Sequence, residues 1–382
     1  MNLRIVMPSI IDPVGHRGGA GATTRTLIKL LQSAPLKAEI AAVPANTERE
    51  VRRGTRQIFS VARSLVSSWP AKAEFVRSGR FLRSVRNSLD TGDADLVMLN
   101  GSDLLWLLPE LPPEIPTILI AHNIEHDLHL SHVERLDSSW RFLQRTLLRD
   151  WRRLREYEMS GTRRIHNVVF LSSRDAEIAR RECADINAIV VPPLFDYSPQ
   201  GWSRARDSDA ELHIGFLGHF GWWPNRDGLR WFLTEVFPFI RETTRLHLFG
   251  EQSKHVVRAD PRIIAHGFIP RLEHIWPMCD LMICPMFAGG GVSVKFAETV
   301  YNGVPVVASS FSARGMPLEP HPSVVLLDHA DEWIRFLRSP AAKELTRLRG
   351  PTRNTKVFEM SSHIAPVHEF VAGVAQQRVL VG

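Results

Sequence analysis

The stretch Cys284-Pro-Met-Phe-Ala-Gly-Gly-Gly-Val-Ser-Val-Lys-Phe-Ala-Glu298 decides how this chain folds and where its chemistry lies. An apolar run typical of a buried strand, 280–284, leads to three consecutive glycines and then to a segment with helical spacing. Glycines let backbone amides approach a ligand closely, and the start of a helix adds positive partial charge. Lys295 adds a full charge, and Glu298, one turn later, can accept hydrogen bonds from ribose hydroxyls. The pattern predicts a site for a diphosphate attached to a ribose.

Strand-like and helix-like segments alternate along the whole chain. Short apolar or β-branched runs bounded by turn residues predict strands at 3–7, 39–43, 95–99, 117–121, 167–171, 188–191, 213–217, 245–249, 280–284, 305–308 and 323–327. Longer segments with helical spacing, such as 23–31 and 136–158, separate these runs. Because this alternation is typical of right-handed βαβ units around a parallel sheet, the sequence predicts an α/β fold.

The length of the chain favours two domains. A chain of 382 residues is too long for one ordinary core, and its 44% apolar and 23% charged residues are typical of a folded globular protein. Prolines, Gly201 and a mixed-charge run interrupt the pattern between 192 and 210. We therefore predict two Rossmann-like domains, residues 1–195 and residues 196–382, and the pattern after Asp328 predicts that the second domain ends in helices.

Composition also bears on location and partners. The three cysteines, Cys183, Cys279 and Cys284, have no metal-ligand spacing and fit a reducing cytoplasm. The first residues lack the apolar core of a secretion signal, and no stretch approaches the roughly 20 uninterrupted apolar residues of a membrane span. The net charge of +6 indicates attraction to an anionic partner, which composition alone leaves open between nucleic acid, a lipid surface and a phosphorylated substrate.

A second glycine-rich loop follows the first predicted strand. Gly18 and Gly19 lie in the run 14–22, which leads to a helix that we expect Thr23 or Thr24 to cap. Backbone amides in such a loop can hold a phosphate, although the spacing is not that of the Rossmann fingerprint. The alternative, that these glycines only make a tight turn between strand and helix, stays open.

The run from Gly289 through Lys295 and Glu298 to Gly303-Val-Pro-Val-Val307 resembles the donor-site signature of the group 1 glycosyltransferases, glycosyltransferase family 4. Other stretches are similar to a bacterial polysaccharide-biosynthesis branch of this family: 121–125, 215–225, 247–250 and 266–269. The resemblance covers nearly all of the chain. It implies the GT-B fold, in which two Rossmann-like domains face a central cleft, with retention of anomeric configuration, no metal ion, and no cofactor besides the nucleotide-sugar donor substrate.

The resemblance also implies roles for individual residues. Glu298 would bind the ribose, and Lys295 would meet the diphosphate and sugar together with backbone amides of the preceding turn. The implied donor-site residues, besides Lys295 and Glu298, are Gly18, Gly19, Gly218, Asn225, Arg226, Phe268, Ile269, Gly290, Gly291, Val292, Ser293 and Val294. Two positions depart from the family pattern. Gly290 stands where many relatives have a carboxylate that holds the donor sugar, and His219 and Asn225 occupy the region of a common Arg and Lys pair, so phosphate neutralisation depends on Lys295 with help from Arg226.

His122 follows a predicted strand of the first domain, in Ala121-His-Asn-Ile-Glu125. The family commonly has a histidine here that faces the donor sugar or the acceptor. With Asn123 and Glu125 beside it, His122 is a candidate for binding sugar hydroxyls or moving a proton. The alternative is a histidine bonded within a strand-end turn. His122, Lys295 and Glu298 are the catalytic candidates, and we predict no nucleophile because retaining enzymes of this fold often lack an evident one.

A basic region lies between residues 49 and 90. It holds nine arginines and Lys72 against three acidic residues, a local excess of seven positive charges, with apolar residues interleaved. This pattern predicts amphipathic helices that can lie on an anionic membrane surface, or ordinary solvated helices whose apolar sides pack on the sheet. A second arginine-rich stretch, 141–164, has acidic neighbours and is expected to form a salt-bridged helix.

With the sequence observations, the resemblance implies a retaining, metal-independent hexosyltransferase. It would move a sugar from a UDP- or GDP-sugar to a saccharide or lipid-linked acceptor in cell-surface polysaccharide biosynthesis. We expect it in the cytoplasm or peripherally on the inner face of the cell membrane, without a nucleic-acid partner. Two alternatives stay open: a sugar-nucleotide epimerase of the same fold, and a non-enzymatic protein that binds nucleic acid or anionic surfaces. The second alternative leaves the loop from Gly289 to Glu298 unexplained.

Overall fold

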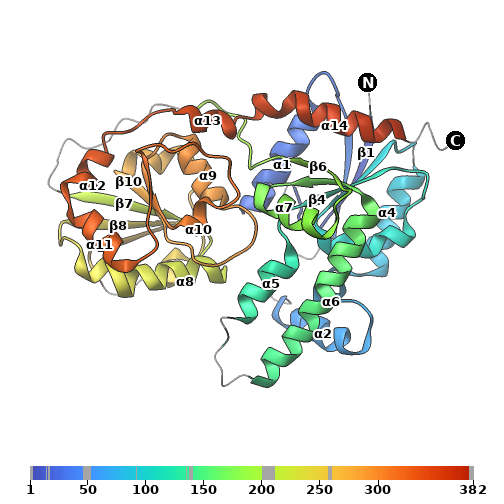
Figure 1. The fold of residues 1–382 in the computed structure, drawn as a ribbon, viewed down its shortest axis with the longest axis horizontal. Coiled ribbons are helices and arrows are strands. Elements are labelled where there is room, and N and C mark those ends of the chain that lie inside the picture. Colours follow the sequence, from blue (N-terminus) through green and yellow to red (C-terminus); the bar gives the residue numbers. More distant parts are fainter. Residues whose placement is uncertain are drawn as a thin grey trace. The chain divides into compact units, whose positions relative to one another are not determined.

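The computed structural model describes residues 3–13, 15, 18–45, 53–91, 93–134, 136, 141–199, 211–256 and 260–377, without the side chains of residues 53–58 and 142. Several features predicted from the sequence lie outside these residues: most of the first glycine-rich loop before Gly18, Arg49 and Arg52 of the basic region, and 200–210 of the expected domain join. The chain forms two compact units (Figure 1). Unit 1 is Met1–Leu194 with Met360–Gly382, and unit 2 is Phe195–Glu359.

The core of unit 1 is a parallel sheet with the strand order β2-β1-β3-β4-β5-β6. Its strands are β1 (Arg4–Ser9), β2 (Glu39–Pro44), β3 (Leu96–Asn100), β4 (Thr117–Ala121), β5 (Asn167–Phe170) and β6 (Asn187–Val190). The order reverses between β1 and β3, because β2 lies on one side of β1 and all later strands lie on the other. In sheets of this kind, ligands bind beyond the carboxyl ends of the strands at the reversal.

Helices cover both faces of this sheet. They are α1 (Gly19–Gln32), α2 (Arg53–Val66), α3 (Ala71–Val76), α4 (Gly79–Asp90), η2 (Ser102–Glu110), α5 (Glu125–Val133), α6 (Arg141–Ile165), α7 (Ser173–Glu182) and α14 (Ile364–Gln376). Successive residues of a strand point to opposite faces, so Ile5 packs with α1 and α14, whereas Val6 packs with α3 and α4. Within the part of the chain that the structure describes, no helix has the length and apolar content needed to cross a membrane.

The last helix belongs to unit 1, which corrects the predicted second domain of residues 196–382. In Figure 1, α14 lies beside α1. Val367 and Val371 of α14 are buried in the same core as Leu30 of α1, and Nε2 of His368 donates a hydrogen bond to the carbonyl oxygen of Leu30 at 2.7 Å. An amphipathic helix can pack on either sheet, so its place in the sequence does not decide which core it completes. The division at 194/195 lies one residue from the predicted boundary.

Unit 2 is built around a second parallel sheet, with the order β12-β11-β10-β7-β8-β9. Its strands are β7 (Leu212–Leu217), β8 (Thr244–Phe249), β9 (Ile263–Gly267), β10 (Leu281–Cys284), β11 (Val306–Ala308) and β12 (Val324–Leu326). Its α-helices are α8 (Trp223–Trp231), α9 (Val294–Tyr301), α10 (Ser310–Ala313), α11 (Ala330–Arg338), α12 (Pro340–Leu345) and α13 (Arg353–Val357). The order reverses between β7 and β10, as in the Rossmann fold. The prediction of two Rossmann-like α/β domains is confirmed.

Glycines bring the loops at the reversal of unit 2 close together. A Cβ atom on Gly228 of α8 would lie 2.2 Å from the carbonyl oxygen of Pro285, so α8 packs directly against the backbone that follows β10. Gly250, after β8, has φ +124°, and a Cβ atom there would lie 2.0 Å from the carbonyl oxygen of Gly218. These contacts leave no space for a side chain, and they fix the loops that follow β7, β8 and β10 relative to one another.

Candidate functional site

The loop after β10 has the backbone that its glycines predict. Gly289 and Gly291 have φ values of +132° and +56°, which other residues rarely adopt. The loop ends at Ser293, the N-cap of α9. The amides of Phe296 and Ala297 donate to the carbonyl oxygen of Ser293 at 3.0 Å, so only the first amides of the helix, those of Val294 and Lys295, have no carbonyl one turn earlier in the helix to bond. Arg314 donates a hydrogen bond from Nη2 to the carbonyl oxygen of Gly289 at 2.7 Å and so anchors the loop. No motif in the sequence marks Arg314, so its role was not predicted.

Lys295 and Asn225 meet at the reversal of the sheet. Lys295 lies in the first turn of α9, and its Nζ donates a hydrogen bond to Oδ1 of Asn225 in the first turn of α8. The ammonium group lies 3.3 Å from the sulfur of Met286 and 5.3 Å from the centre of the Phe216 ring. Burial among these groups lowers the pKa of Lys295. The structure thus holds the predicted cation against Asn225 of α8 and the ring of Phe216 in β7.

Asn225 is itself held in one orientation. Its Nδ2 donates to the carbonyl oxygen of His219 at 2.8 Å, and a carbonyl oxygen can only accept, so Oδ1 must face Lys295. Gly218 gives the room for this arrangement, because a Cβ atom on Gly218 would lie 2.9 Å from Nδ2 of Asn225. The structure therefore brings together Gly218, Asn225 and Lys295, three of the predicted donor-site residues.

Glu298 lies one turn beyond Lys295 on α9 and is half-buried. Burial raises the pKa of Glu298 to about 7, and a hydrogen bond from the Tyr197 hydroxyl, 3.3 Å from Oε1, opposes that rise. Near neutral pH this carboxyl group is therefore close to its titration midpoint. Tyr197 was not predicted from the sequence, since it lies in the segment expected to be a linker.

The other predicted donor-site residues of unit 2 lie on α8, in the loop before α9, at the start of α9 and after β9. The side chain of Arg226 is exposed on α8, and Gly290, Val292, Ser293 and Val294 are half-buried in the loop and at the start of α9. Phe268 and Ile269 follow β9 at the edge of the sheet, where Phe268 is exposed and Ile269 is half-buried. Their position beyond the strand ends fits contact with a base, and this role stays a prediction.

Unit 1 has a polar group of its own at its reversal. Asn100 ends β3 and is buried, and its Nδ2 donates to the hydroxyls of Ser9 at 2.8 Å and Thr24 at 3.2 Å. Both hydroxyls donate to backbone carbonyls, so they accept from Asn100. Oδ1 of Asn100 must therefore face Nε2 of His122, 2.7 Å away, and accept a hydrogen bond from it.

This hydrogen bond fixes the state of His122. The proton of the neutral ring lies on Nε2, which leaves the lone pair on Nδ1. Burial lowers the pKa of His122 to about 4, so the ring is uncharged at neutral pH. Asn123 and Glu125, which were predicted to act beside His122, make other contacts: Asn123 donates a hydrogen bond to Glu125 at 3.0 Å, and Glu125 forms an ion pair with Lys72. Asn100 was not predicted, because 22 residues separate it from His122 and no local pattern links the two.

The loop before α1 differs from the prediction in one respect. The helix begins at Gly19, and Gly18 is the N-cap. The expectation that Thr23 or Thr24 caps this helix is wrong, since both lie inside it and donate to carbonyl oxygens one turn earlier. Glycine at both the cap and the first helical position leaves the backbone accessible, as a ligand-binding loop requires.

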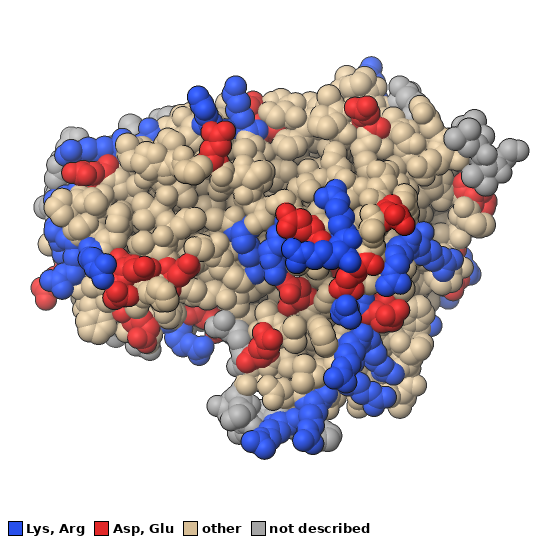
Figure 2. All heavy atoms as spheres, viewed as in Figure 1, with Lys and Arg blue, Asp and Glu red and all other residues tan. Residues whose placement is uncertain are grey.

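The basic region of unit 1 is partly neutralised by ion pairs. Glu74 is buried and pairs with Arg63 at 3.2 Å and with Arg77 at 3.5 Å. Lys72 pairs with Glu125, and Arg86 pairs with Glu110. The local excess counted from the sequence therefore overstates the charge that faces solvent here. In Figure 2 the basic side chains gather along α6, where Arg145, Arg149 and Arg152 are exposed.

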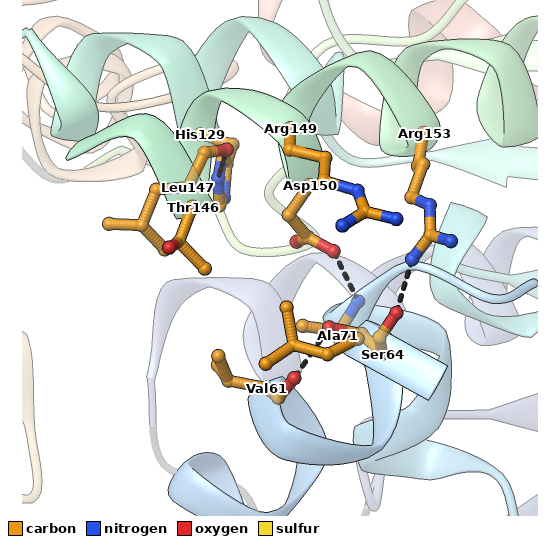
Figure 3. A pocket seen from close by; sticks show the side chains of 10 residues that line it. Val61, Ser64, Ala71, His129, Thr146, Leu147, Arg149, Asp150 and Arg153 are labelled. Carbon is orange, nitrogen blue, oxygen red and sulfur yellow. Dashed lines mark hydrogen bonds between the residues drawn. The ribbon is translucent and has the colours of Figure 1, made fainter. Parts of the chain in front are cut away.

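A small pocket of about 40 Å³ lies between α2, α5 and α6 (Figure 3). Asp150 accepts a hydrogen bond from the backbone nitrogen of Ala71 at 2.9 Å, at the start of α3, and Arg153 donates to the carbonyl oxygen of Ser64. These contacts tie α2 and α3 to α6. None of the residues that line the pocket is a predicted site residue.

Comparisons with known proteins agree with this geometry. Residues 211–332, which lie in unit 2, match the family described as "Glycosyl transferases group 1". Over these residues, unit 2 contains a group 1 glycosyltransferase domain. A search of curated proteins finds no match to the chain.

Solved structures show that the chain has the GT-B fold. Sucrose-phosphate synthase from Thermosynechococcus elongatus superposes with a TM-score of 0.64 at 13% identity, over 97% of this chain and 99% of that one. HepE from Anabaena, in complex with UDP and glucose, gives 0.63 at 14% identity, over 97% and 100%. WaaG, a glycosyltransferase involved in lipopolysaccharide biosynthesis, gives 0.53 at 13% identity, over 98% and 99%.

Proposed function

We propose that unit 2 of this glycosyltransferase binds a nucleoside-diphosphate sugar where β7 and β10 end, and that the sugar is transferred with retention and without a metal ion. The observation that carries this proposal is the contact between Lys295 and Asn225 at the start of α9, with Glu298 one turn later. HepE binds UDP and glucose, which favours a UDP-sugar among the possible donors.

The chemistry of transfer follows from the charges in this group. When the bond to the sugar breaks, negative charge develops on the departing diphosphate. In this proposal the first amides of α9 and the ammonium group of Lys295 stabilise that charge, since both lie at the start of the same helix. In this proposal the ribose hydroxyls donate to Glu298, and the phosphate of the donor assists in removing the proton of the acceptor.

We propose that unit 1 binds the acceptor, a saccharide or lipid-linked saccharide of cell-surface polysaccharide biosynthesis. The polar group at the reversal of its sheet includes the neutral ring of His122, whose Nδ1 can accept a hydrogen bond from a sugar hydroxyl. The lipopolysaccharide enzymes WaaB and WaaG among the structural neighbours support this class of acceptor.

A panel of UDP-, GDP- and dTDP-sugars tests the donor proposal. A donor that binds the folded state raises the melting temperature, and the Glu298→Gln variant should lose most of that rise. Product analysis with the donor that binds then separates transfer from epimerisation, since an epimerase converts the sugar without an acceptor. A wild-type protein that no nucleotide sugar stabilises would remove the basis for this function.

We also propose that the protein lies in the cytoplasm and associates peripherally with anionic membranes through α2 and the first half of α6. Three apolar side chains of α2 face solvent: Phe59, Leu65 and Val66 are 69%, 47% and 90% exposed. Exposed arginines of α6 add positive charge, each contributing about 1 kcal/mol near such a surface. The Phe59→Ser and Val66→Ser double variant should sediment less with anionic vesicles than wild type, whereas Phe239→Ser, an exposed residue of unit 2, should not. Equal sedimentation of all three proteins contradicts the membrane proposal.

A further inference from the structure

The first residues of unit 2 are fixed against the end of α9. The ring of Phe195 stacks on Tyr301 of α9 with a centroid distance of 4.8 Å, and its backbone nitrogen donates to the carbonyl oxygen of Phe358 at 2.8 Å. The hydroxyl of Tyr301 donates to the carbonyl oxygen of Tyr197. Two residues after Phe195, the side chain of Tyr197 is therefore held in place beside α9, although the sequence there reads as a linker.

The hydrogen bonds around Tyr197 have a defined direction. Nδ2 of Asn302 donates to the carbonyl oxygen of Glu298 at 2.8 Å, and this contact identifies it as the amide nitrogen. The same nitrogen lies 2.9 Å from the hydroxyl oxygen of Tyr197, so that oxygen accepts from Asn302. The hydrogen of the Tyr197 hydroxyl is then directed at Oε1 of Glu298, 3.3 Å away.

We propose that Tyr197 is a positioning residue that holds the Glu298 carboxylate in the orientation and the ionised form that bind the ribose of the donor. This inference rests on the proposed donor site in unit 2. The hydrogen bond occupies Oε1, which fixes the plane of the carboxylate and leaves Oε2 for a ribose hydroxyl. A residue in the segment that joins the two units thereby acts on donor binding through Glu298.

The pKa values of the two residues agree with this arrangement. Burial raises the pKa of Glu298 to about 7, and the bond from Tyr197 favours the ionised form that accepts it. Burial, and then the charge of Glu298, raises the pKa of Tyr197, so the hydroxyl keeps its proton and stays a donor. Loss of the hydroxyl should therefore raise the pKa of Glu298 further, and donor binding should require a higher pH.

The test compares Tyr197→Phe with Tyr157→Phe, which removes a hydroxyl from a hydrogen-bonded tyrosine of unit 1. Calorimetry measures UDP binding between pH 6 and pH 9, with GDP as the probe if UDP does not bind. We expect the midpoint of the binding profile to rise by about one pH unit in Tyr197→Phe, which weakens binding about fivefold at pH 7 and much less at pH 9. Tyr157→Phe should keep the wild-type profile.

A second comparison, made in the Glu298→Gln variant, separates a positioning role of Tyr197 from a general loss of structure. Glu298→Gln cannot titrate, so adding Tyr197→Phe to it should leave the pH profile flat and change affinity less than it does in wild type. An unchanged profile in Tyr197→Phe, or an equal shift in Tyr157→Phe, overturns the positioning role while the donor site stands. If wild type binds neither nucleotide, or if Glu298→Gln binds as wild type does, the donor site itself fails.

Discussion

Each unit of this glycosyltransferase holds a buried asparagine at the reversal of its sheet, and the two asparagines hold different bases. Asn100 in unit 1 and Asn225 in unit 2 are both anchored through their amide nitrogens. Their oxygens accept hydrogen bonds from His122 and Lys295 respectively. Each unit thus uses an asparagine to orient a basic side chain near the reversal of its sheet, although the two asparagines lie on different elements.

The difference lies in charge. Burial lowers the pKa of both bases, but His122 has an ordinary value of 6.5 and falls to about 4, so it is neutral at pH 7. Lys295 begins from 10.5, and its contacts with an amide oxygen and an aromatic face suit an ammonium ion. Unit 1 therefore presents a neutral ring, and unit 2 presents a cation, which are the groups that the proposed acceptor and donor sites require.

Removal of the cation tests this contrast most strongly. Lys295→Ala should lower kcat/KM by about 10²- to 10³-fold, the usual loss when one preorganised group that stabilises developing charge is removed. Steady-state kinetics with the donor found in the panel measures the effect. Lys343→Ala, an exposed lysine on α12, is the matched control and should behave as wild type. Wild-type kinetics in Lys295→Ala would remove this residue from the site.

The Asn100→Asp variant should make the His122 ring more readily charged, and so more like the cationic Lys295 of unit 2. A carboxylate at position 100 lies against His122 and should raise the pKa of that ring by about 1 to 3 units from its value of about 4. NMR titration of the His122 ring, assigned with His122→Gln, measures the change.

The same variant changes how stability depends on pH. In wild type the pKa of His122 is lower in the folded state than its ordinary value of 6.5, so stability present above pH 6.5 is lost as pH falls toward 4. A smaller pKa difference in Asn100→Asp reduces that loss, which melting temperatures at pH 5 and pH 7 report. An unchanged titration midpoint means that Asn100 does not control His122.

Local patterns predicted the two sheets and the loop from Gly289 to Glu298, because strand periodicity and a glycine turn are encoded by adjacent residues. The partners of the site residues were not predictable in this way. Tyr197 reaches Glu298 across 101 residues, and Asn225 reaches Lys295 across 70. Such contacts depend on which loops the sheet order brings together, and no short-range pattern records that order.

The scaffold that carries each asparagine also differs between the units. Asn100 ends a strand, whereas Asn225 lies on α8, whose distance from the sheet depends on Gly228. Gly228→Ala should push α8 away from Pro285, destabilise unit 2 by about 1 to 3 kcal/mol and weaken UDP binding. Denaturant unfolding and calorimetry measure the two effects. His122 should keep its titration midpoint in this variant, because its asparagine lies in the other unit, and loss of that midpoint would show that the two groups are coupled.

The prediction with the smallest expected effect tests whether α14 packs in unit 1. Gly373 lies inside α14 with no atom near the position of a Cβ, so Gly373→Ala removes backbone freedom from the unfolded chain without a clash. We expect about 0.5 to 1 kcal/mol of added stability. Because α14 shares a core with α1, hydrogen exchange should slow in α14 and α1 and stay unchanged in α9. Slower exchange in α9 instead would assign the helix to unit 2, as the sequence had predicted. In that case the stability of unit 2, which holds Lys295, would depend on α14, although the structure places α14 in unit 1 with His122.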